Sequence, residues 1–280
     1  MSNPSLYGSE VRGIRSRRSI LTIAFFFVPL TAPQAQVHDG DRDHDHLHFS
    51  HPLVTESPSP DTKIRLDYIY STTSGITGIR EDAIRLEGEY GFTDGLSLAL
   101  VAPFISVKSP TVDRTSGLGN IELSLKAASL VFAERGLLLG GGLSAALPTG
   151  SDQKGIGSSH IVEVEPFVDV GYKRGAFELV GFSRLSSTFH RRAGEEAERN
   201  LAFDFSALYQ ILSRLEGLLE VTTARALIGP ESGTQQTFVA PGLKVYPFTN
   251  RQLMFGASME IGTGIVHDTR ALLVSGFYHF

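Results

Sequence analysis

The chain has 280 residues, 41% of them hydrophobic, and a formal net charge of −5 at pH 7. The absence of cysteine excludes disulfide frameworks and cysteine-based metal sites. A mean hydropathy of +0.01 is too polar for a bundle of membrane helices, and the negative charge argues against a nucleic-acid partner.

The first segment, residues 1–35, has the pattern of a secretory signal peptide. Four arginines between positions 12 and 18 precede an apolar run from Ile20 to Leu30, and small residues follow up to Ala35. This run is shorter than the roughly 20 residues that a membrane helix needs. We therefore predict export and cleavage near Ala35, which leaves a more acidic mature chain.

Residues 36–60 form a separate segment that is rich in histidine and aspartate. Imidazole and carboxylate groups at this density bind divalent transition metals, so we predict a leader that captures such a metal. We expect the protein to require no cofactor. The alternative is a solvated leader with a stiff spacer at 57–60. On both interpretations we expect a disordered periplasmic segment. The candidate metal ligands are His38, His44, His46, His48, His51, Asp41, Asp43 and Asp45.

From residue 61 to residue 280, apolar and polar side chains alternate with the period of a β-strand. In residues 63–70, for example, Ile64 and Leu66 alternate with Arg65 and Asp67. The pattern predicts an all-β chain. Further strands are expected at about 83–90, 96–104, 119–130, 137–148, 160–172, 176–186, 200–211, 215–223, 236–246, 252–262 and 270–280.

The connections between these strands alternate in length. Short turns are expected at 91–95, 132–136, 173–175, 212–214 and 247–251, and longer polar loops at 71–80, 105–118, 149–159, 187–199, 224–235 and 263–269. Short periplasmic turns and longer external loops are typical of outer-membrane barrels. The sequence therefore predicts a transmembrane antiparallel up-and-down β-barrel of about 12 strands, surrounded by the lipid of a bacterial outer membrane.

The last predicted strand, residues 270–280, carries an apolar or small face that ends in aromatic side chains. This face consists of Leu272, Val274, Gly276, Tyr278 and Phe280. Such a strand is typical of the end of an outer-membrane barrel, where the apolar face meets lipid and aromatic rings lie at the interface. We expect the barrel-assembly machinery to be its partner.

The charged face of the strands is expected to line the lumen. A ring of carboxylates in a water-filled pore favours cations. The alternative is that the acids pair with the few bases and fill the barrel. Because about eight strands give a filled interior and 16–18 leave a channel, we expect a narrow, partly occupied lumen. The predicted lumen residues are Asp67, Glu87, Glu89, Glu122, Lys126, Glu163, Glu165, Asp169, Glu220, Lys244 and Glu260.

Four stretches, at 89–104, 117–126, 146–150 and 239–246, carry a family resemblance. They include Gly-Phe-Thr-Asp-Gly at 91–95 and Ala-Leu-Pro-Thr-Gly at 146–150. Across roughly residues 61–280 the chain resembles a family of outer-membrane transporters named after the MetA pathway of phenol degradation. The resemblance implies an outer-membrane channel or porin-like transporter.

An enzyme is the less favoured interpretation. The histidines at 160, 190, 267 and 279 have serines nearby at 159, 187 and 275, but the sequence shows no serine, histidine and acid arrangement typical of a catalytic triad. We therefore predict that the protein is not an enzyme.

These features together predict an outer-membrane channel or transporter for small solutes. Metal cations are the favoured cargo, because the leader and the predicted lumen are both rich in acids. Two alternatives stay open, namely a channel for small organic or aromatic compounds and a closed structural barrel without transport.

Overall fold

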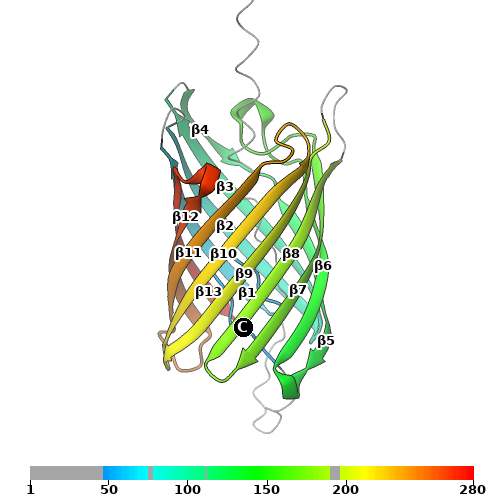
Figure 1. The fold of residues 1–280 in the computed structure, drawn as a ribbon, viewed down its shortest axis with the longest axis vertical. Coiled ribbons are helices and arrows are strands. Elements are labelled where there is room, and N and C mark those ends of the chain that lie inside the picture. The colour runs from blue at the N-terminus through cyan, green and yellow to red at the C-terminus, as the bar shows by residue number, and fades with distance from the viewer. Residues whose placement is uncertain (1–46, 75–77, 111, 190–195) are drawn as a thin grey trace, which may run out of the picture.

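A computed structural model of the protein describes residues 47–74, 78–110, 112–189 and 196–280. In these residues, strands form one closed antiparallel sheet, because β1 (Lys63–Thr73) pairs with both β2 (Ile79–Thr93) and β13 (Thr269–His279) (Figure 1). The other strands are β3 (Leu96–Ser109), β4 (Val112–Leu118), β5 (Glu122–Phe132), β6 (Leu137–Ala146), β7 (Val162–Arg174), β8 (Phe177–Phe189), β9 (Arg199–Leu212), β10 (Leu215–Ile228), β11 (Gln235–Val245) and β12 (Leu253–Thr263). Short 3₁₀ helices are η1 (Ala133–Arg135), η2 (Asp152–Lys154) and η3 (Gly264–Val266).

The sheet confirms the predicted twelve-stranded barrel and adds one strand. β4 pairs with the C-terminal part of β3, and β5 pairs with its N-terminal part. Together they therefore occupy one position in the wall. They are separated by residues 119–121, where the Asn120 side chain accepts hydrogen bonds from Gly150 and Ser158 of the following loop. The prediction of a loop at 105–118 was wrong, because its two halves pair as a hairpin, with Val107 opposite Thr115.

The two faces of the wall differ in polarity. On β1, Arg65 and Asp67 are buried inside the barrel, whereas Ile64 and Leu66 point outward and are 46% and 53% exposed. The same alternation places Leu272 and Tyr278 of β13 outside, as predicted for the last strand. An outward belt of large apolar side chains is stable in contact with lipid, so the barrel spans a membrane. Within the described residues, no helix is long and apolar enough to cross a membrane.

The two ends of the barrel differ in their connections. The tight turns 94–95, 175–176 and 213–214 lie at the end that holds the C-terminus, and the long connection 147–161 and β4 lie at the opposite end (Figure 1). In outer-membrane barrels the end with short turns faces the periplasm, and we name the two ends accordingly. This arrangement agrees with the predicted pattern of turns and loops.

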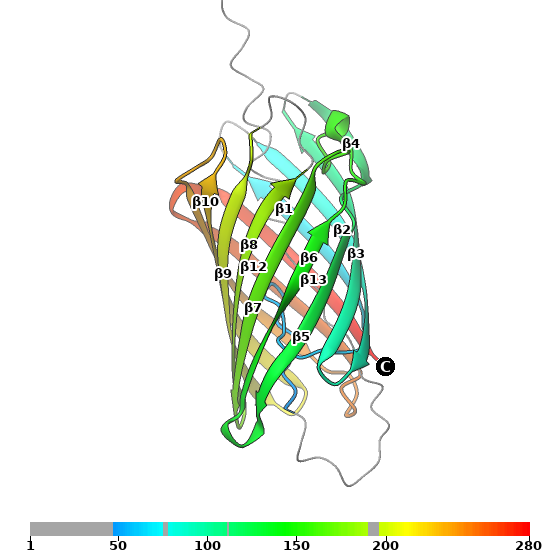
Figure 2. The same ribbon diagram turned by 90° about the vertical axis from the view of Figure 1, so that its right-hand side faces the viewer.

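Residues 47–62, here named the lumenal segment, enter the barrel before β1. The segment is drawn in blue in the lower half of the barrel in Figure 2. Phe49 and Leu53 have no exposed surface, and they share an apolar cluster with Leu138, Val180 and other inward side chains. For residues 47–60 this packing differs from the expected disorder, and residues 36–46 lie outside the described residues. The signal peptide expected at 1–35 lies outside the described residues.

Candidate functional site

The lumenal segment is seated in the wall by two glycines. Gly171 of β7 lies against the Phe49 ring, and a Cβ added there would be 2.6 Å from Phe49 Cζ. Gly256 of β12 lies against Leu53, and a Cβ there would be 2.5 Å from a methyl carbon of that leucine. Only glycine leaves room for these two apolar side chains at the inner wall. The wall is therefore shaped around the segment.

Backbone N–H groups of the segment donate to carboxylates of the wall. Leu53, Val54 and Thr55 donate to Glu220 of β10 over 3.2, 3.0 and 2.8 Å. Ser50 donates to Glu178 of β8 over 2.7 Å. Hydrogen bonds to ionised groups are stronger than neutral ones, and they satisfy backbone groups that no β-ladder pairs. The segment therefore depends on the wall acids for its backbone hydrogen bonds.

Basic side chains of the wall bind the carbonyl groups of the same segment. Lys244 donates to the His51 carbonyl oxygen over 2.8 Å, and Arg65 donates to that of Leu53. Lys126 donates to the Ser57 carbonyl oxygen and forms an ion pair of 3.0 Å with Glu56. These lysines and Glu56 are almost fully buried. Because unpaired buried charges are costly, the segment and the wall stabilise each other.

Several wall acids near the segment already have basic partners. Lys63 forms ion pairs with Glu87 at 3.1 Å and with Glu89 at 3.0 Å. Asp67 accepts hydrogen bonds from Arg65, at 2.8 Å, and from Arg85. In this part of the lumen, acidic and basic side chains therefore form a network of ion pairs that neutralise one another.

The external half of the lumen has a different charge balance. Five inward carboxylates, here named the acidic belt, lie there with few bases. Arg184 forms an ion pair of 2.5 Å with Asp204 and lies 3.8 Å from Glu165. Glu122 interacts electrostatically with Glu165, and Glu260 interacts with Asp204. Arg85 is a basic neighbour of both Glu122 and Glu260. The acidic belt consists of Glu122, Glu163, Glu165, Asp204 and Glu260.

The structure places every predicted lumen residue on the inward face of its strand. Nine of them are classed as buried, and Glu163 and Glu260 are half-buried. The sequence pattern missed Glu178 and Arg184, because the inward face of β8 also carries Val180 and Phe182. Phe182 stacks on Phe167 with ring centroids 5.0 Å apart. Because the inward face of β8 carries both apolar and charged side chains, the alternation of polarity does not identify which face of this strand is inward.

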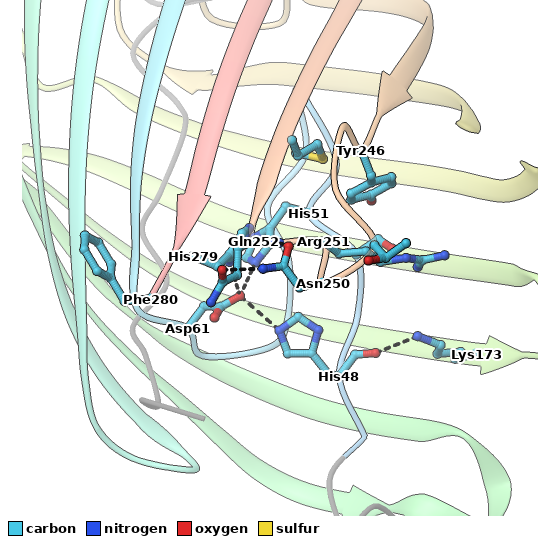
Figure 3. A pocket seen from close by; sticks show the side chains of 13 residues that line it. His48, His51, Asp61, Lys173, Tyr246, Asn250, Arg251, Gln252, His279 and Phe280 are labelled. Carbon is cyan, nitrogen blue, oxygen red and sulfur yellow. Dashed lines mark hydrogen bonds and ion pairs between the residues drawn. The ribbon is translucent and has the colours of Figure 1, made fainter. Parts of the chain in front are cut away.

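The predicted metal ligands fall into two groups. His38, His44, His46, Asp41, Asp43 and Asp45 lie outside the described residues. His48 and His51 lie at the periplasmic mouth, where both Nε2 atoms face Asp61 Oδ2, at 2.9 and 2.6 Å (Figure 3). His279 Nδ1 of β13 lies 3.1 Å from the same oxygen. A cavity of about 810 Å³ borders this cluster.

The environment fixes the charges of this cluster. Burial lowers the pKa of His51 well below its ordinary value, and the neighbouring Lys63 lowers it further. Burial by itself would raise the pKa of Asp61, but hydrogen bonds from His279, His48 and His51 hold that pKa well below its ordinary value. Asp61 is therefore an anion and His51 a neutral imidazole at neutral pH.

The serine and histidine pairs considered for catalysis do not form a triad in the described residues. His160 Nδ1 lies 3.0 Å from Asp152, and Ser158 Oγ lies 3.4 Å from the same nitrogen. In a triad the acid and the nucleophile contact different ring nitrogens. Ser159 donates to Asp152 rather than to His160. His190 lies outside the described residues.

No protein-family model and no curated protein matches the chain. Among solved structures, the KdgM porin in complex with disordered oligogalacturonate is 12% identical over 77% of this chain and 99% of that chain, with a TM-score of 0.48.

Two further structures are more similar in fold. The translocator domain of the autotransporter NalP from Neisseria meningitidis is 10% identical over 78% of this chain and 88% of that chain, with a TM-score of 0.52. The COG4313 outer membrane channel from Pseudomonas putida F1 is 15% identical over 78% of this chain and 95% of that chain, with a TM-score of 0.61. None of these three names mentions the MetA pathway of phenol degradation, so that resemblance stays a prediction. With its closed sheet and apolar exterior, the chain is a β-barrel of the outer-membrane type.

Proposed function

We propose that the protein is a channel for small solutes that favours cations, and that the lumenal segment restricts the passage. Transport rather than catalysis is favoured because the fold is similar to that of an outer-membrane channel. The proposal concerns the path through the barrel, from the acidic belt to the periplasmic mouth.

The observation that carries the proposal is the excess of acids on the inward face. Carboxylates that line a pore attract cations and repel anions. Asp169 is 4% exposed, and neither of its carboxylate oxygens accepts a hydrogen bond within the described residues. The inward acids are Asp67, Glu81, Glu87, Glu89, Glu122, Glu163, Glu165, Asp169, Glu178, Asp204, Glu216, Glu220 and Glu260, and the inward bases are Lys63, Arg65, Arg85, Lys126, Arg184 and Lys244.

The lumenal segment restricts this path without blocking it permanently. Its contacts are hydrogen bonds, ion pairs and the packing of Phe49 and Leu53, and all of these are reversible. Displacement of the segment would widen the lumen and would leave the acids that now bind it facing the pore. We therefore expect a closed or weakly conducting state and an open state of the same barrel.

Planar-bilayer recordings under a KCl gradient test this proposal. The full chain should give a small conductance, with a reversal potential shifted toward the equilibrium potential of K⁺. Deletion of residues 47–60 should raise the conductance several-fold while cation selectivity persists. Anion selectivity, or no conductance in either protein, contradicts the proposal. The second result would support a closed structural barrel.

A channel for small organic or aromatic compounds is the second candidate. It is supported by inward aromatic and aliphatic side chains, among them the stacked Phe167 and Phe182. Vesicles that contain the barrel would distinguish the two cargoes. If benzoate enters faster than K⁺ through the deleted barrel, the organic cargo is favoured, and the reverse order favours cations.

A further inference from the structure

Three imidazole rings converge on one carboxylate oxygen at the periplasmic mouth. His48 and His51 come from the start of the lumenal segment, Asp61 from its end, and His279 from the last strand (Figure 3). We propose that these four residues form a binding site for a divalent transition metal, and that the bound ion ties both ends of the lumenal segment to β13.

The distances between ligand atoms suit an ion after a small expansion. Ligand atoms of His48, His51 and Asp61 all lie within 4.8 Å of one another. Zinc binds imidazole nitrogen at about 2.0–2.1 Å in a tetrahedral site, which separates neighbouring ligand atoms by roughly 3.4 Å. The nitrogen-to-oxygen distances of 2.9 and 2.6 Å would therefore lengthen by less than about 1 Å. His279 does not belong to this group of three, but its Nδ1 lies 3.1 Å from the same Asp61 oxygen, and we propose it as the fourth ligand.

The ligand chemistry selects the class of ion. Three imidazoles and one carboxylate suit zinc, copper, nickel or iron, whereas calcium and magnesium prefer an all-oxygen set. The rings already lie close together, because the centroid of the His51 ring is 5.1 Å from that of His279 and 6.0 Å from that of His48. An ion would replace the contacts that now hold these rings on Asp61.

Proton positions show what the ion must displace. Lys63 Nζ lies 3.3 Å from His51 Nδ1, and an ammonium group only donates, so the neutral ring carries its proton on Nε2 toward Asp61. A metal at Nε2 displaces that proton and moves it to Nδ1. Lys63 must then turn toward Glu87 and Glu89, with which it already forms ion pairs.

Calorimetric titration of the purified full-length barrel with ZnCl₂ tests the site. The histidines at 38, 44 and 46 are first replaced by alanine, because they can bind zinc independently of this cluster. We expect this background protein to bind one Zn²⁺ per chain. His48→Gln and Asp61→Asn should each weaken binding by at least about tenfold, and Co²⁺ in place of Zn²⁺ should give the visible absorption of a four-coordinate site.

His267→Gln is the matched control, because His267 lies 3.2 Å from Asp268 in an exposed loop at the other end of the barrel. This variant should bind zinc as the background does. His48 is 46% exposed, so its replacement should leave folding intact, and the heat-dependent shift of the barrel on a gel verifies this. No zinc binding by the folded background protein overturns the proposal, and so does equal binding by all variants. Zinc binding is measured without conductance, so this proposal and the proposed channel function can fail independently of each other.

Discussion

The periplasmic and external halves of the lumen use the same kinds of side chain in different ways. In the periplasmic half, wall acids and bases bind the backbone of the lumenal segment or one another. In the external half, the five carboxylates of the acidic belt share two nearby bases, Arg184 and Arg85. An inward carboxylate can therefore hold the chain in place or shape the electrostatic potential of the pore.

Glu220 and Glu260 illustrate the difference. They lie on β10 and β12 and interact electrostatically. Glu220 is fully buried and accepts hydrogen bonds from three successive N–H groups of the lumenal segment. Glu260 is half-buried, and acids dominate its electrostatic surroundings. The same substitution at the two positions should therefore have different consequences.

The largest effect is expected for Glu220→Ala. A hydrogen bond to a charged group contributes about 1.5–3 kcal/mol, so the free energy that holds the lumenal segment in the barrel should fall by at least about 3 kcal/mol. This corresponds to a rise of roughly 100-fold in the ratio of open to closed channels. The measurement is the open probability in single-channel recordings.

Glu260→Ala is the matched control for this variant. It should leave the open probability within a few-fold of that of the unchanged protein, because the acidic belt does not hold the segment. Equal opening by the two variants would mean that the two halves do not differ in the way described.

A steric change in the periplasmic half should have the next largest effect. Gly171→Leu places a side chain where the Phe49 ring lies, so the segment should be displaced and the mean conductance should rise. Phe49→Ala in the same protein should restore part of the closed state by making room. Limited proteolysis near residue 50 provides a second measurement, since a displaced segment is cleaved faster.

Gly88→Leu is the control for this experiment. A Cβ at Gly88 has no heavy atom within 4 Å, and the residue lies on the outward face of β2. This variant should conduct and resist protease like the unchanged protein. If Gly171→Leu also leaves both readouts unchanged, the glycine does not determine how Phe49 is seated.

A change in the acidic belt should alter selectivity rather than opening. Replacement of Glu122, Glu165 and Glu260 by glutamine removes three negative charges and keeps the side-chain volumes. The reversal potential under a KCl gradient should move toward zero by a large fraction of its initial value, with little change in open probability. Glu134→Gln, in the exposed helix η1 at a periplasmic turn, should not move it. An unchanged potential in the triple variant would remove the belt from the selectivity mechanism.

On most strands the sequence predicted which residues face inward, but it did not predict what they bind. Alternation within a strand is local, so the outward Leu272 and Tyr278 and the inward Asp67 could be assigned from spacing alone. The contact between Glu220 and Val54 joins residues 166 positions apart, and no periodicity reports such a pair. The division between acids that hold the segment and acids that face the pore therefore required the structure.

The proposed metal site shows the same limit on a smaller scale. The histidine-rich composition indicated His48 and His51, because ligand types can be counted in a sequence. His279 was assigned to the last strand, and Asp61 to the start of the barrel. They join the cluster because β13 pairs with β1, with Lys63 opposite His279, which brings the two ends of the barrel sequence together. Barrel closure, rather than local pattern, brings these ligands together.

The smallest effect is expected for Lys173→Met, at the edge of the occupied half. Lys173 donates to the His48 carbonyl oxygen over 2.9 Å and forms an ion pair of 2.8 Å with Glu178, but its side chain is 36% exposed. Water and salt screen such a pair, so its loss should cost the seated segment no more than about 1 kcal/mol. Open probability should therefore rise by less than about tenfold, and the difference from the unchanged protein should shrink in 1 M KCl. A rise as large as that of Glu220→Ala would show that the segment is held mainly at the mouth, and that burial does not determine which contacts keep the lumen closed.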